Sequence, residues 1–182
     1  MKTFGIIVYT VIVLAISRLI PHPPNFTPIL AMAVTMPMLT SDRYMAVVIP
    51  LLAMFVSDIF IGFHSYMFWV YTSFIAVTLS SYVFMKQFKF VNVWIMSLLS
   101  SLLFFIVTNF GVWTSGYYGY TLTGLITCYI MAIPFFTNTV LSTLFYGTII
   151  KTLYEVKEKW PLNYRKSVSY THLRAHETNG YL

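Results

Sequence analysis

The chain alternates between long apolar runs and short polar segments. Apolar runs cover about residues 4–20, 25–39, 44–63, 66–85, 91–113 and 122–153. A helix needs about 20 residues to cross the hydrocarbon core of a bilayer, and most of these runs approach or exceed that length. The pattern therefore predicts an all-α membrane protein. We expect a bundle of six transmembrane helices that forms one domain over residues 1–167.

The run at 25–39 leaves two topologies open. It is short, and Pro28 and Pro37 lie near its two ends. As a spanning helix it keeps the N-terminus inside. As a re-entrant segment it would place the N-terminus outside, while every later loop would stay on the same side of the membrane as before. We favour six spans, because extension to Ser41 brings the helix into the permitted length range. The last run is long enough to continue as a cytoplasmic helix, which we expect Pro161 to end.

Composition and charge support the membrane assignment. The 182 residues are 58% hydrophobic and 9% charged, whereas soluble domains carry about 25% charged residues. The net charge of +6 does not predict nucleic-acid binding, because the basic residues lie between or beyond the apolar runs and no nucleic-acid-binding motif is present. Lys and Arg in short loops mark the cytoplasmic face. We therefore expect an inner-membrane protein in contact with the lipid bilayer, with both termini cytoplasmic and only Arg18 on the outer side.

The last residues read differently from the rest. Residues 168–178 have the sequence Val-Ser-Tyr-Thr-His-Leu-Arg-Ala-His-Glu-Thr, which resembles one translated frame of a transposase adaptor used to build sequencing libraries. The composition also turns abruptly polar there. We therefore interpret residues 168–182 as an adaptor artefact without a native domain, and exclude them from functional reasoning.

Two charges lie within the apolar runs in the outer half of the predicted bundle. Asp58 is the only acid inside a run and Arg18 the only base at the same depth. Charged groups within membrane spans are costly and are usually paired or line a water-accessible cavity. An Arg18–Asp58 pair is the simplest arrangement that satisfies both. It serves either as a staple between helices or as the floor of an outward-facing pocket, and the residues alone leave both readings open.

Other polar and aromatic residues gather in the same outer half of the predicted bundle. The candidate substrate-binding residues are Arg18, His22, Asn25, Asp58, His64, Asn109, Trp113 and Tyr117. The two histidines share no metal-ligand spacing, and Cys128 is the only cysteine, so we expect neither a metal site nor a cofactor. Catalytic motifs and paired carboxylates are absent from the sequence, which argues against an enzyme.

Three segments resemble motifs of small uncharacterised bacterial membrane proteins that are classed as transport proteins. These proteins are akin to the substrate-binding S-components of energy-coupling factor (ECF) transporters. The segments are Pro21-His-Pro-Pro-Asn-Phe-Thr-Pro-Ile, Ser57-Asp-Ile-Phe-Ile-Gly-Phe-His and Thr108-Asn-Phe-Gly-Val-Trp. The resemblance implies an S-component-like fold that captures a vitamin or micronutrient from outside. It also implies a partner module with a coupling subunit and two ATPases.

One feature departs from that family. S-components often dock through an Ala-xxx-Ala patch on the first helix, and Ala15 has no small partner four residues on. Our interpretation is a membrane transport protein that binds a small solute at an outward-facing pocket and is energised by a separate ATPase module. The alternatives are a non-catalytic membrane scaffold that binds partner helices and a membrane enzyme acting on lipid or quinone.

Overall fold

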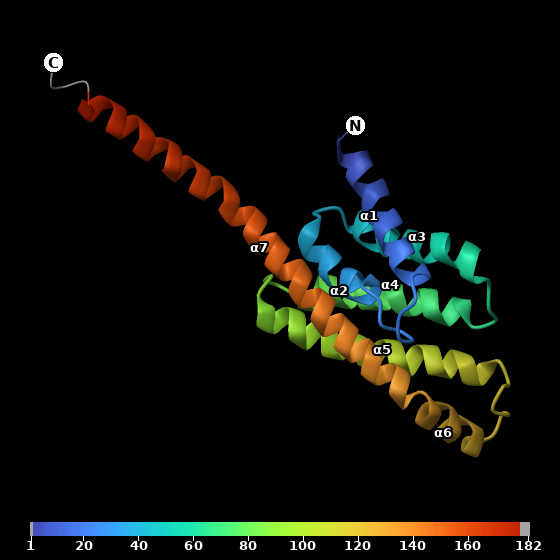
Figure 1. The fold of residues 1–182 in the computed structure, drawn as a ribbon. Helices are drawn as coiled ribbons and strands as arrows, with labels where there is room; N and C mark the ends of the chain where they lie inside the picture. The colour runs from blue at the N-terminus through green and yellow to red at the C-terminus, as the bar shows by residue number, and fades with distance from the viewer. Residues whose placement is uncertain (1, 179–182) are drawn as a thin grey trace.

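The structure is a computed structural model that describes the backbone of residues 2–178 and the side chains of residues 4–159. Over the described residues the chain forms seven α-helices and no strand (Figure 1). The helices are α1 (Lys2–Leu19), α2 (Ile29–Leu39), α3 (Arg43–Ile61), α4 (Met67–Phe84), α5 (Phe90–Thr114), α6 (Leu122–Met131) and α7 (Ile133–Thr178).

Four helices are long and apolar enough to cross a membrane: α3, α4, α5 and the stretch Ile133–Lys159 of α7. Their outer faces carry large apolar side chains that no neighbour covers. Phe60, Phe68 and Phe84 are each 70% exposed or more. Exposed apolar surface on this scale marks a lipid-facing or partner-facing exterior. The all-α membrane protein predicted from the sequence is present, but with seven helices over the described residues rather than six.

Helix α2 is shorter than predicted. It has 11 residues and ends at Leu39 without extending to Ser41, so at about 1.5 Å per residue it reaches about 16 Å. The hydrocarbon core measures about 30 Å. The segment before α2 contains Pro21, Pro23 and Pro24 and stays non-helical, and the helix begins only after Pro28. Proline lacks the backbone N–H that a helix interior needs, so it is tolerated only at the helix start.

This short helix forms the centre of the bundle. It packs against α3, α4, α5 and α7, and eight of its 11 residues are buried. Helix α1 packs on the outside of α3. The C-terminal ends of the two helices lie close together, where Arg18 of α1 contacts Met54, Ser57 and Asp58 of α3.

The predicted helix at 122–153 is broken into α6 and α7 at Ala132. Pro134 explains the break, because its ring clashes with the carbonyl of the residue four positions earlier and its nitrogen cannot donate a hydrogen bond. The prediction that Pro161 ends the last helix is wrong, since α7 continues to Thr178 and projects beyond the bundle in Figure 1. A proline removes one helical hydrogen bond, which need not stop the helix. The side chains of residues 168–182 lie outside the described residues, and their adaptor origin stays a prediction.

The two ends of the bundle differ in charge. Arg43 starts α3, Lys86 and Lys89 flank the turn between α4 and α5, and Lys151 lies on α7, so these four residues share one end. We call it the basic end. The loops at the other end, residues 62–66 and 115–121, contain no Lys, Arg, Asp or Glu. We call this the uncharged end.

Candidate functional site

The predicted Arg18–Asp58 pair is present between α1 and α3. Arg18 Nη1 lies 2.6 Å from Asp58 Oδ1 and also donates to Ser57 Oγ at 2.7 Å and to the Met54 carbonyl at 3.3 Å. The second carboxylate oxygen of Asp58 accepts a hydrogen bond from the Tyr71 hydroxyl at 2.7 Å. Both oxygens of the carboxylate are therefore satisfied within the protein.

This network ties three helices together, because Tyr71 belongs to α4. The Asp58 side chain is 1% exposed and that of Arg18 is 18% exposed. A charge removed from water is stable only when a partner compensates it fully, and here each charge compensates the other. The geometry is that of a staple between helices.

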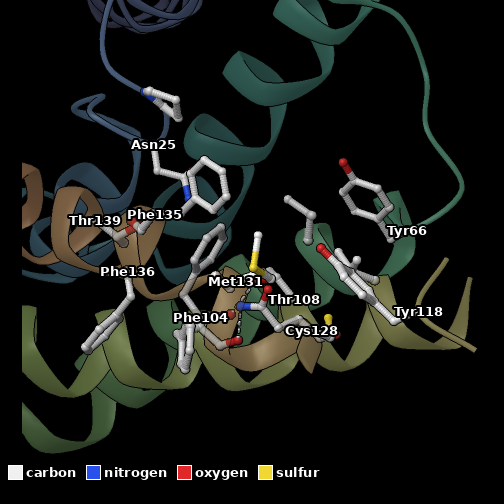
Figure 2. A pocket seen from close by; sticks show the side chains of 16 residues that line it. Asn25, Tyr66, Phe104, Thr108, Tyr118, Cys128, Met131, Phe135, Phe136 and Thr139 are labelled. Carbon is white, nitrogen blue, oxygen red and sulfur yellow. Dashed lines mark hydrogen bonds between the residues drawn. The ribbon is translucent and has the colours of Figure 1, made fainter. Parts of the chain in front are cut away.

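A cavity of about 340 Å³ lies elsewhere, at the uncharged end. Pockets for small organic ligands begin at about 300 Å³, so one small molecule fits. The walls come from α4, α5, α6 and α7, and the segment before α2 also lies along the cavity (Figure 2). The lining residues are Pro24, Asn25, Tyr66, Val70, Phe104, Phe105, Thr108, Asn109, Val112, Tyr118, Cys128, Met131, Ala132, Phe135, Phe136 and Thr139.

The short α2 helix explains the cavity. A helix that began at the uncharged end would fill the space between its neighbours along the whole bundle. Instead α2 starts only at Ile29, and the segment Pro24–Asn25 lies at the cavity wall before it. The break at Ala132 adds to the space, because the residues on both sides of it, Met131 and Phe135, line the cavity.

Hydrogen bonds hold this segment against α7. Asn138 Nδ2 donates to the Pro24 carbonyl at 3.0 Å, and Ser142 Oγ donates to the Asn25 carbonyl at 3.2 Å. Asn25 has a φ of 63°, a left-handed conformation that asparagine tolerates better than most residues. This part of the cavity wall is therefore held in place by α7, and asparagine suits the left-handed backbone at position 25.

Two tyrosines lie on the side of the cavity away from Asn25. In Figure 2, Tyr66 and Tyr118 are on one side and Asn25 is on the other. Tyr118 belongs to the loop between α5 and α6, which turns through Gly116 and Gly119 with φ of 82° and 76°. A Cβ at Gly124 would overlap the backbone carbonyls of Tyr118 and Gly119. The loop that carries Tyr118 therefore packs tightly against the start of α6.

Only two of the predicted site residues line the cavity, Asn25 and Asn109. Asn109 Nδ2 donates to the Phe105 carbonyl at 2.7 Å, which leaves its Oδ1 and one N–H without a bond to another described residue. Arg18 and Asp58 are not among the lining residues. His22 is exposed, and its two ring nitrogens lie 2.7 Å from the Pro23 carbonyl and 3.2 Å from the Arg18 carbonyl.

The remaining predicted residues lie near the cavity without lining it. The His64 ring stacks on Tyr66 with centroids 4.0 Å apart. Burial lowers the pKa of His64, opposed by the Asp58 carboxylate and reinforced by the Arg18 guanidinium, so the ring is neutral at pH 7. Trp113 packs against Phe110 and Tyr120. Tyr117 is 82% exposed, and its neighbour Tyr118 takes the place at the cavity.

Sequence reasoning did not single out most of the lining residues. Phe104, Phe105 and Phe136 lie within apolar runs, where an aromatic ring facing a cavity has the same sequence signature as one facing lipid. Thr108 belongs to one of the resembling motifs but carried no assigned role. In the part of the chain whose side chains are described, no group of three His, Cys, Asp or Glu residues gathers into a metal site.

Comparison with curated proteins gives no significant match, and comparison with solved structures gives none. A sequence family does match the chain, over residues 1–164. That span contains every residue of the cavity and of the Arg18–Asp58 network. The chain belongs to the family of unknown function DUF6580.

Proposed function

We propose that this protein is a membrane transport component that captures a small, ring-bearing solute in the cavity at the uncharged end. One observation carries the proposal: a cavity of about 340 Å³ walled by aromatic side chains lies at one end of a bundle of apolar helices. Ligand sites are concave and mostly apolar, with a few polar groups that orient the ligand. The lining residues fit that description.

The proposed orientation places the uncharged end outside the cell. Cytoplasmic loops of membrane proteins carry an excess of Lys and Arg, and Arg43, Lys86 and Lys89 all lie at the basic end. In the inner membrane of a bacterium, the cavity then faces the external medium and both termini are cytoplasmic. The chain crosses six times, with α2 and its preceding segment as one crossing and α6 with α7 as another.

A separate module supplies the energy in this proposal. The resemblance to ECF S-components implies a coupling subunit and ATPases, and the long α7 helix, which runs from the cavity to the basic end, offers a contact for them. The described lining residues include no carboxylate, imidazole or amine, the commonest acid–base groups, which favours a binding role.

The scaffold alternative needs an exposed helix face of small residues that a partner helix can approach closely. The small-residue pair Ala53 and Ser57 on α3 would suit a partner helix, yet both residues are fully buried within the bundle. The equivalent pair on α4, Ala76 and Ser80, keeps partial exposure. A partner helix therefore has one such face available rather than two.

The proposal is tested by identifying what the cavity holds. Detergent-purified protein is extracted with organic solvent, and co-purifying small molecules are identified by mass spectrometry. The test variant is Thr108→Trp, which places a large ring in the cavity. Its control is Leu102→Trp on the same helix, where the side chain is 45% exposed on the outer face.

A compound present in the wild type and in Leu102→Trp, but lost from Thr108→Trp, supports the proposal. Wild-type protein that carries no compound and gains no thermal stability from a panel of small aromatic solutes contradicts it. The scaffold alternative then becomes the working explanation, and capture of a membrane partner is its test.

A further inference from the structure

We propose that the solute held in the cavity is uncharged and that the carboxamides of Asn25 and Asn109 recognise its polar edge. This inference rests on the proposed function and adds the chemical class of the solute. It differs from the pocket reading of the sequence, in which the Arg18–Asp58 pair forms the floor of the binding site.

The first argument is the absence of any counter-charge. No described lining residue is Asp, Glu, Lys, Arg or His. The two charges in this half of the bundle, Arg18 and Asp58, are bonded to each other 2.6 Å apart, and Tyr71 occupies the second carboxylate oxygen. An ionised solute would lose its water on entry and gain no partner, which is costly in an apolar site.

The second argument is which polar groups remain free. Three lining side chains already donate to backbone carbonyls: Thr108 Oγ1 at 2.7 Å, Thr139 Oγ1 at 2.8 Å and Cys128 Sγ at 3.4 Å. These groups are satisfied by the protein. Their donor hydrogens are occupied, so the two hydroxyls can meet a solute only as acceptors.

Two carboxamides remain for the solute. The Asn25 side chain bonds to no other described residue, and Asn109 keeps its Oδ1 and one N–H. A carboxamide both donates and accepts, so the pair suits a neutral edge that also presents a donor and an acceptor. Amides, lactams and neutral nitrogen heterocycles have such edges. The hydroxyls of Tyr66 and Tyr118 lie on the opposite side of the cavity from Asn25 in Figure 2 and add two further polar groups.

The third argument is the shape of the apolar wall. Six aromatic rings line the cavity, and aromatic side chains prefer offset or edge-to-face contacts with other flat rings. A ring-bearing solute therefore gains contact area without needing a charge. The lining rings belong to Tyr66, Phe104, Phe105, Tyr118, Phe135 and Phe136.

A matched set of probes tests the charge preference. 2-Naphthamide is neutral, 2-naphthoate is an anion and 2-naphthylmethylamine is a cation at pH 7, and all share one ring system. Each is titrated against the full-length protein in nanodiscs of zwitterionic lipid, and the thermal stabilisation gives its half-maximal concentration. We expect naphthamide to act at a concentration at least about tenfold lower than either ion, because only the ions lose hydration without compensation.

Variants test the two carboxamides. Asn109→Leu keeps the side-chain shape, and Asn25→Gly keeps the left-handed backbone that residue 25 adopts. Each change is expected to weaken naphthamide binding by about three- to tenfold, the effect of one lost hydrogen bond. Binding of 2-methylnaphthalene, which has no polar edge, should stay unchanged. Asn92→Leu is the matched control, since Asn92 lies on α5 at the basic end and donates to the Gln87 carbonyl.

The outcomes separate this inference from the proposed function. An ion that binds as tightly as naphthamide, or a co-purified compound that is charged at pH 7, overturns the inference while solute binding stands. An uncharged co-purified compound, or the expected order of the probes, supports it. Failure of every probe together with an empty solvent extract overturns both.

Discussion

Removing one partner of the Arg18–Asp58 pair should destabilise the bundle far more than removing both. In Arg18→Met the carboxylate of Asp58, 1% exposed, keeps only the Tyr71 hydroxyl. A buried charge stripped of its partner costs about 3–5 kcal/mol. In Asp58→Leu the loss should be smaller, about 1–2 kcal/mol, because Arg18 is partly exposed and its long side chain can reach the interface. It also keeps its bond to Ser57.

The double variant Arg18→Met/Asp58→Leu restores balance by removing both charges. Replacing a buried ion pair by apolar groups of similar size is often neutral or stabilising, so we expect it within about 1 kcal/mol of the wild type. The assay is equilibrium unfolding in mixed micelles with rising SDS, followed by tryptophan fluorescence. A double variant that is as unstable as the sum of the single variants would refute the staple, as would an Arg18→Met cost below about 1 kcal/mol.

The same double variant distinguishes the staple from the pocket reading of these two residues. Neither residue lines the cavity, so the folded double variant should retain any co-purified solute. Loss of the solute at unchanged stability would show that the pair binds the solute directly.

Three further predictions concern the surroundings of the cavity. Gly124→Ala should displace the loop carrying Tyr118, because the added Cβ meets the backbone of that loop, and should therefore abolish solute retention. The control Gly5→Ala, where a Cβ meets nothing within 4 Å, should retain the solute. Equal retention in both variants would contradict this prediction. Because burial lowers the pKa of His64, the unfolded chain binds more protons than the folded chain below about pH 6.5. The free energy of unfolding should therefore fall as the pH drops through this range. A His64→Gln variant that loses as much stability on acidification would argue against this. Cys128, buried at the cavity wall, should react with N-ethylmaleimide more slowly when 2-naphthamide is bound, as followed by intact mass. An unchanged rate at saturating 2-naphthamide would count against binding of the probe beside Cys128.

Several features of the fold follow from the sequence alone. Apolar run lengths are read over windows of about 20 residues, so the membrane class and the long helices α3, α4 and α5 are predicted within a few residues. The pairing of Arg18 with Asp58 also follows from the sequence. When only one base and one acid lie at the same depth, leaving either without a partner costs more than any other arrangement.

Helix lengths and breaks in the crowded centre needed the tertiary structure. The length of α2 depends on where the proline-rich segment before it ends and the helix begins. It also depends on the hydrogen bonds from Asn138 and Ser142 that hold that segment. Window hydropathy does not register such contacts. The same holds at Ala132, because a hydrophobic run reads as continuous whether or not Pro134 interrupts its hydrogen bonds.

The sequence by itself determined the class of protein, the asymmetry of charge between its ends and the partner of Asp58. Only the tertiary structure decided which aromatic and polar side chains face a cavity. The physical reason is that lipid, core and cavity wall all accept the same apolar residues, so composition does not distinguish them. Asn109, predicted from the sequence, and Tyr118 line a cavity because α2 begins too late to fill the space beside them.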